Sequence, residues 1–155
     1  MKTINKILIT ILLVSCQPLF AQSYNEDRVS LTNFLTRMYN NAPFEGVRVV
    51  NDYDNNYLLS ILSLDKTKYP NDSAMIRVAS VKAMSQASRF FNGSSITSDL
   101  IIRTSEKSDG TGDTEIIENI REHSVGYVQA LELLTTFAGN DGWQVFIFCK
   151  RLDLK

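Results

Sequence analysis

Histidine and cysteine are scarce in this chain of 155 residues, and their scarcity limits the chemistry that the chain can carry. His123 is the only histidine, so metal sites built from several histidines are excluded. Cys149 is the only cysteine beyond the N-terminal segment, which predicts a protein without an intramolecular disulfide. The sequence also lacks a Gly-x-Ser-x-Gly motif and a phosphate loop ending in Gly-Lys-Ser or Gly-Lys-Thr. We therefore expect no metal and no cofactor.

Neither sign of charge dominates the chain. Lysine and arginine number 16, and aspartate and glutamate number 17, which gives a formal net charge of −1 at pH 7. The two signs are mixed along the sequence, without polybasic or polyacidic blocks. A protein that binds nucleic acid needs a net basic footprint against the phosphate backbone. The composition therefore argues against a nucleic-acid partner.

The longest apolar run near the N-terminus is short. It extends from Ile7 to Val14, and two basic residues, Lys2 and Lys6, precede it. A helix that spans a bilayer needs about 20 apolar residues, so this run does not predict a transmembrane helix. A short apolar core behind a basic start is typical of a secretory signal, so the sequence predicts export.

Two processing sites follow this apolar run. Leu13-Val14-Ser15-Cys16 resembles a bacterial lipobox, in which Cys16 receives lipid after removal of residues 1–15. Leu19-Phe20-Ala21 offers ordinary cleavage after Ala21, which would remove residues 1–21. The first route gives a membrane-tethered protein and the second a soluble one. Both stay open, and a lipid on Cys16 is the only membrane contact that we expect.

Residues 22–155 are long enough for one domain with a single core. Hydrophobic periodicity predicts an α+β fold, with an antiparallel sheet of about five strands packed by one or two helices. The helices are expected at residues 27–40 and 73–91. Strand patterns cover residues 47–53, 57–64, 96–104, 114–124, 125–137 and 143–152. Residues 114–124 fit a helix as well, and strand is the favoured interpretation.

The second expected helix carries a stripe of small residues. Ala79, Ala83 and Ala87 recur at intervals of four, and Gly93 follows the last apolar position. Small side chains on one stripe let a helix approach a sheet closely. We therefore expect this helix to pack against the strands.

The last expected strand is apolar on both faces. Phe146 and Phe148 alternate with Val145 and Ile147, so the two pairs point to opposite sides. Either the strand is central and covered on both sides, or the face with Phe146 and Phe148 is a docking surface. We favour a central strand that is covered on both sides. Phe146 and Phe148 remain candidate docking residues.

Cys149 and His123 are the residues that an enzyme would use, because a thiolate nucleophile needs a nearby base or positive charge. Cys149 shares a strand face with Val145 and Ile147, and unmodified cysteine is among the most buried residue types. We therefore favour a core role for Cys149 and assign no catalytic residue.

Two segments carry a resemblance to a known family. Val78-Ala79-Ser80-Val81-Lys82-Ala83-Met84 is an Ala-rich helix, and Ser124-Val125-Gly126-Tyr127-Val128 is a Ser-x-Gly segment. Together they resemble the small outer-membrane lipoproteins of the twenty-kilodalton type and the related N-terminal domain of a flagellar assembly protein. The likeness covers residues 57–152. It implies that the Ser-x-Gly segment starts a late strand, and that the domain is a non-enzymatic partner-binding or assembly module.

The sequence as a whole predicts an exported, non-catalytic binding or assembly module of the bacterial envelope, in the periplasm or at the outer membrane. Its expected partner is an envelope protein. One alternative is a small thiol-dependent enzyme that uses Cys149 and His123. Another is a secreted inhibitor or immunity-type protein, which would be soluble and independent of lipid attachment.

Overall fold

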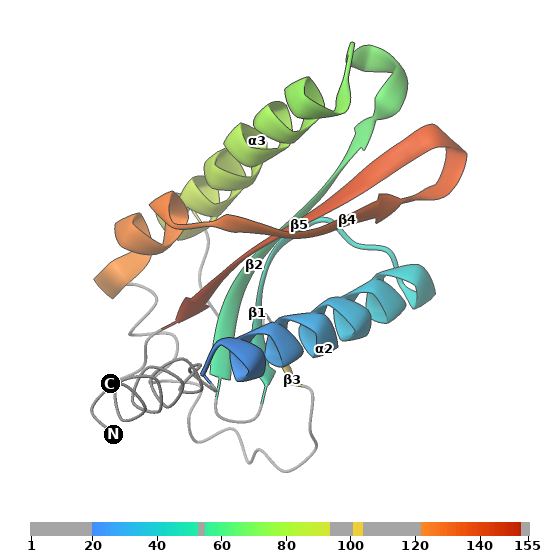
Figure 1. Cartoon of the computed structure of the whole chain (residues 1–155). Coiled ribbons are helices and arrows are strands. Elements are labelled where there is room, and N and C mark those ends of the chain that lie inside the picture. The colour runs from blue at the N-terminus through green and yellow to red at the C-terminus, as the bar shows by residue number, and fades with distance from the viewer. Residues whose placement is uncertain (1–19, 53–54, 94–100, 104–121, 153–155) are drawn as a thin grey trace, which may run out of the picture. The chain divides into compact units, whose positions relative to one another are not determined.

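The computed structural model describes residues 20–52, 55–93, 101–103 and 122–152 (Figure 1). The chain divides into two compact units, Met1–Asn41 and Ala42–Lys155, and each is described by itself. The single domain expected over residues 22–155 thus spans the second unit and most of the helix of the first.

The described part of the first unit is helix α2, Phe20–Asn41, which begins seven residues before the expected start. Leu31 and Leu35 are buried one turn apart, as a helical stripe requires. Val29, which the same pattern places on this face, is exposed instead. The helix ends just before Pro43, because proline cannot continue the hydrogen-bonded turn and disfavours helix in the residue before it.

The second unit is built on a five-stranded sheet in the order β3-β1-β2-β5-β4 (Figure 1). The strands are β1 Gly46–Asp52, β2 Asn55–Asp65, β3 Ile101–Arg103, β4 Glu132–Ala138 and β5 Trp143–Leu152. Strands β1, β2, β5 and β4 pair antiparallel, whereas the short β3 pairs parallel to β1. The α+β class and the antiparallel sheet are therefore confirmed, with four antiparallel strands and a parallel fifth. Of the strand expected over residues 96–104, the described part is β3.

The first two strands form the hairpin that the sequence predicts. Their register runs from Gly46 opposite Ile61 to Asp52 opposite Asn55. Near the turn, the Asn51 side-chain amide donates a hydrogen bond of 2.9 Å to Asn56 Oδ1. This bond gives a partner to the side-chain carbonyl oxygen of Asn56, a buried residue.

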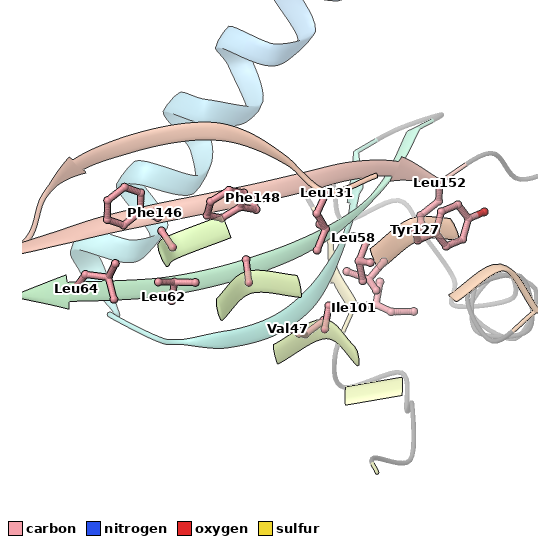
Figure 2. Packing of buried hydrophobic residues seen from close by; sticks show 14 of the residues in the cluster. Val47, Leu58, Leu62, Leu64, Ile101, Tyr127, Leu131, Phe146, Phe148 and Leu152 are labelled. Carbon is pink, nitrogen blue, oxygen red and sulfur yellow. The ribbon is translucent and has the colours of Figure 1, made fainter. Parts of the chain in front are cut away.

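Helix α3, Asp72–Gly93, packs on one face of the sheet. Asn71 caps it, because its side-chain oxygen accepts a 2.8 Å hydrogen bond from the Ala74 amide. Ala79, Ala83 and Ala87 are fully buried, which confirms the close packing expected from the small-residue stripe. The packing excludes water around a cluster that also contains residues from every strand except β4 (Figure 2).

One polar bond fixes this helix to the sheet. Ser60 is fully buried in β2, and its hydroxyl donates a 3.2 Å hydrogen bond to the main-chain oxygen of Ala83. A buried hydroxyl without a partner would destabilise the fold, so the bond both satisfies Ser60 and sets the distance between α3 and β2.

Strand β5 is central in the sheet, with β2 on one side and β4 on the other. Phe146 and Phe148 are 1% and 2% exposed and lie in the core cluster beneath α3 (Figure 2). Val145 and Ile147, on the opposite face, are also fully buried. The candidate docking residues Phe146 and Phe148 are thus core residues of a covered strand, and they do not form an open surface.

The expectation of strand at the end of 114–124 and at the start of 125–137 is wrong. Residues 122–129 are helical, and β4 begins only at Glu132, while residues 114–121 lie outside the described part. Tyr127 and Leu131 are buried in the core cluster, whereas Val125 is 70% exposed. This spacing of four is helical, and it outweighs the β-propensity of the individual side chains. The Ser-x-Gly segment at Ser124–Val128 therefore lies in a helix and does not start a strand.

Candidate functional site

Cys149 and His123, the two residues of the thiol-enzyme alternative, lie in different elements of the second unit. Cys149 is buried in β5, opposite Leu59 of β2 and Glu132 of β4. Since Cys149 directly follows Phe148, it points to the sheet face opposite α3. The centre of the His123 ring lies 5.9 Å from the centre of the Tyr127 ring. Tyr127 belongs to the cluster on the α3 face.

Two N-terminal residues are candidate processing positions. Cys16 lies outside the residues that the structure describes. Ala21 is the second residue of α2, and cleavage after it would leave most of that helix in the mature chain. Within the described ranges, no helix has the length and apolarity needed to cross a membrane. The same ranges contain no group of three or more histidine, cysteine, aspartate or glutamate side chains arranged to hold a metal ion.

A polar recess of about 460 Å³ lies beside α3 in the second unit. We call it the α3 cleft. One wall comes from four residues of α3, spaced so that they share a helical face. The other wall comes from the start of β1 and the end of β2. The lining residues are Glu45, Gly46, Leu62, Ser63, Lys82, Ser85, Gln86 and Arg89.

The cleft forms where β2 extends beyond β1. The pairing of the two strands begins at Gly46 opposite Ile61, but β2 continues to Asp65 with β5 as its antiparallel partner. At this overhang, side chains replace the missing strand. The Ser63 amide donates a 3.0 Å hydrogen bond to Glu45 Oε1, and the Gln86 side-chain amide donates one of 3.3 Å to the Ile61 carbonyl.

The Glu45 carboxylate is fixed in the cleft by a single residue. Both the main-chain amide and the hydroxyl of Ser63 donate to the same oxygen, Oε1. Both hydrogen bonds within the described residues use Oε1, so Oε2 can accept a further hydrogen bond. Glu45 itself is exposed to solvent.

Gly46 shapes the entrance on this side. Its φ of +125° lies where side-chain-bearing residues are rarely found. A Cβ at this position would be 3.7 Å from both the Arg48 guanidinium and the Gln86 amide, so space is adequate and the requirement for glycine is conformational.

The α3 wall carries positive charge. Lys82 makes no ion pair within the described residues, and Arg89 donates a 3.3 Å hydrogen bond to the neutral hydroxyl of Ser85. Arg48 stands beside the cleft, where its guanidinium donates to the Val47 carbonyl at 2.8 Å and lies 5.4 Å from the centre of the Phe44 ring. Two cations and one carboxylate therefore line the cleft, on opposite walls.

Sequence reasoning missed the α3 cleft. The signal was present, because Lys82, Ser85, Gln86 and Arg89 form a polar stripe next to the small-residue stripe of the same helix. A polar stripe is normally solvated, however, and its recess depends on β2 being longer than β1. Pattern alone does not reveal that difference in length.

A second hollow of about 220 Å³ lies between the end of α3 and the helical residues 122–129. None of the described residues that line it is charged. Its walls are Ser88, Phe91, Asn92, Ser124, Val125, Val128 and Gln129. Without an ionic anchor it offers less specific recognition than the α3 cleft.

Comparison of the chain with protein-family models, curated proteins and solved structures found no match.

Proposed function

We propose that this protein is an exported, non-catalytic binding or assembly module of the bacterial envelope, and that it binds its partner through the α3 cleft. The observation that carries the proposal is that a fixed carboxylate, Glu45, and the cations Lys82 and Arg89 line opposite walls of one cleft. A recess with a few convergent polar groups is the usual form of a binding site.

The chemistry of the lining favours binding over catalysis. A hydrolytic role would need the Ser63 hydroxyl as nucleophile and Glu45 as its base. The main-chain amide of Ser63 donates to the same Glu45 oxygen as the hydroxyl does, which is how a side chain caps an open strand. A carboxylate is also a weak base toward a serine hydroxyl. The thiol alternative is disfavoured because Cys149 is buried on the sheet face opposite α3.

The N-terminal sequence supports the location. Lys2 and Lys6 precede the short apolar run from Ile7 to Val14, as in a secretory signal. The intact mass of the protein purified from its host tests this, with Cys16→Ala as the control. A lipid-bearing chain that starts at Cys16 would indicate a tethered envelope protein. A bare chain that starts at Gln22 would indicate a soluble exported one, and an uncut chain would contradict export.

Chemical cross-linking in intact cells tests the binding role. The cleft variant is Lys82→Ala with Arg89→Ala, and the matched control is Lys66→Ala with Arg77→Ala, which removes two exposed cations outside the cleft. We expect a discrete cross-linked product in the wild type and in the control, and its loss in the cleft variant. A product that survives in the cleft variant would contradict binding through the α3 cleft.

Cys149→Ala separates this proposal from the enzyme alternative. A binding module should keep its cross-linked product and its fold, because the substitution only trims a buried side chain. A thiol enzyme would lose its function while staying folded. The inhibitor or immunity-type alternative predicts a soluble mature chain and a product that forms with an added, secreted target.

A further inference from the structure

We propose that the ligand of the α3 cleft is a short extended peptide whose two ends supply an ammonium group and a carboxylate. The inference rests on the proposed function, since it names what the same cleft binds. The carboxylate lies against Lys82 and Arg89, and the ammonium group lies against Glu45.

The α3 wall is complementary to a carboxylate. Lys82 has no acidic partner within the described residues, and the contact of Arg89 with Ser85 leaves its charge uncompensated. The guanidinium and the ammonium group form strong charge-assisted hydrogen bonds with carboxylates. The Ser85 hydroxyl and the Gln86 amide add neutral hydrogen-bonding groups on the same helical face.

The opposite wall is complementary to a cation. The two hydrogen bonds from Ser63 hold Glu45 in one orientation, so little order is lost when a ligand binds its Oε2 atom. A ligand with negative charge alone would be repelled by Glu45, and a ligand with positive charge alone would be repelled by Lys82 and Arg89. A ligand with both charges avoids both penalties.

The open end of the sheet favours a peptide over a free amino acid. From the last pair with β1, Gly46 opposite Ile61, the edge of β2 carries the Ile61 carbonyl, which accepts a hydrogen bond from a side chain, and the Ser63 amide, which donates one to a side chain. Since alternate residues of a strand direct their polar groups to the same side, the Ser63 carbonyl faces this side too. An extended peptide offers matching amide and carbonyl groups at the strand spacing. The volume of about 460 Å³ lies within the usual range of ligand pockets.

Titration with three related probes tests the inference. Triglycine carries both charges, N-acetyl-triglycine carries only the carboxylate, and triglycine amide carries only the ammonium group. Binding to the purified protein is followed by amide chemical shifts in NMR spectra. We expect triglycine to shift the Ser63 main-chain and Gln86 side-chain amide signals and to bind about tenfold more tightly than either blocked probe.

Matched variants assign each charge to its wall. Glu45→Gln should make triglycine and N-acetyl-triglycine bind equally, while Lys82→Ala with Arg89→Ala should make triglycine and triglycine amide bind equally. Lys66→Ala with Arg77→Ala should leave all three affinities unchanged, because these residues do not line the cleft. Unchanged amide spectra away from the cleft verify that each variant is folded.

Two results would overturn the inference. Equal binding of triglycine and N-acetyl-triglycine to the wild type would make the cleft a simple anion site. No shift with any probe would show that the cleft does not bind a short peptide. In either case, a cross-linked product that depends on Lys82 and Arg89 would still support the proposed function, so the two failures are distinguishable.

Discussion

The contact between α3 and β2 gives the sharpest test of the fold, and Ala83→Leu is the change that probes it. Ala83 is fully buried, and its main-chain oxygen lies 3.2 Å from the hydroxyl of Ser60. A leucine at this position must either push α3 away from the sheet or distort the side chains around it. Because leucine and alanine both favour helix, intrinsic helix propensity contributes little to the effect.

The expected loss of stability has two parts. Adding methylene groups to a well-packed core typically costs about 1–3 kcal/mol in the free energy of unfolding. Displacement of α3 would also lengthen the hydrogen bond from Ser60 to Ala83, which is worth about 1 kcal/mol. We therefore expect Ala83→Leu to destabilise the protein by about 2–4 kcal/mol.

Urea denaturation followed by circular dichroism measures this loss, and Val81→Leu is the control. Val81 lies on the same helix but is 64% exposed, so its substitution should change the free energy of unfolding by less than about 0.5 kcal/mol. The slope of the free energy against urea concentration should stay constant, so that a shifted midpoint reports stability alone. If Ala83→Leu were as stable as the control, the close packing of α3 on β2 would be refuted.

Four further changes have defined outcomes. Ser60→Ala should cost about 1 kcal/mol in urea denaturation, through the loss of the buried bond to α3, and a neutral result would contradict that bond. Gly46→Ala should cost about 1–3 kcal/mol because of its positive φ, and a stabilised variant would contradict that conformation. Hydrogen bonds from the Thr67 hydroxyl and main-chain amide lower the pKa of Asp65, so Thr67→Val should raise that pKa in a carboxyl NMR titration. A lowered folded pKa means that this contribution to stability is present above the ordinary aspartate pKa and is lost as the pH falls through the folded value. Cys149→Ala should destabilise the fold only modestly, by about 1 kcal/mol, and should leave probe binding unchanged, whereas loss of binding in a folded variant would point to a role for the thiol.

The parts of the fold that the sequence predicts well are those with strong local signals. The hairpin of β1 and β2 follows from two β-rich runs around Asp54-Asn55-Asn56, and α3 follows from its cap and its small-residue stripe. Residues 122–129 could not be assigned in this way, since Val125, Tyr127 and Val128 have high β-propensity. Their helical state depends on Tyr127 and Leu131 both reaching the core cluster, which is a tertiary effect.

The candidate site was harder to predict than the fold for a related reason. Cys149 and His123 stand out because their side chains are reactive and rare, yet the register places the thiol on the face opposite α3. The residues that do form a recess, Lys82 and Arg89, are of the commonest surface types. What makes them a candidate site is the position of Glu45 across the cleft, and that position depends on where β1 begins.

The core and the α3 cleft depend on the same rotation of helix α3. Ala83 and Ala87 face the sheet, and Gln86, between them in sequence, reaches the Ile61 carbonyl at the open end of β2. A rotation that relieved crowding at Ala83 would move Gln86 away from that carbonyl and shift Lys82 relative to Glu45. The α3 wall of the cleft is preorganised in its backbone, since packing of Ala83 and Ala87 on the core fixes the helix. Variants that disturb the core near Ala83 should therefore weaken probe binding even where they keep the protein folded.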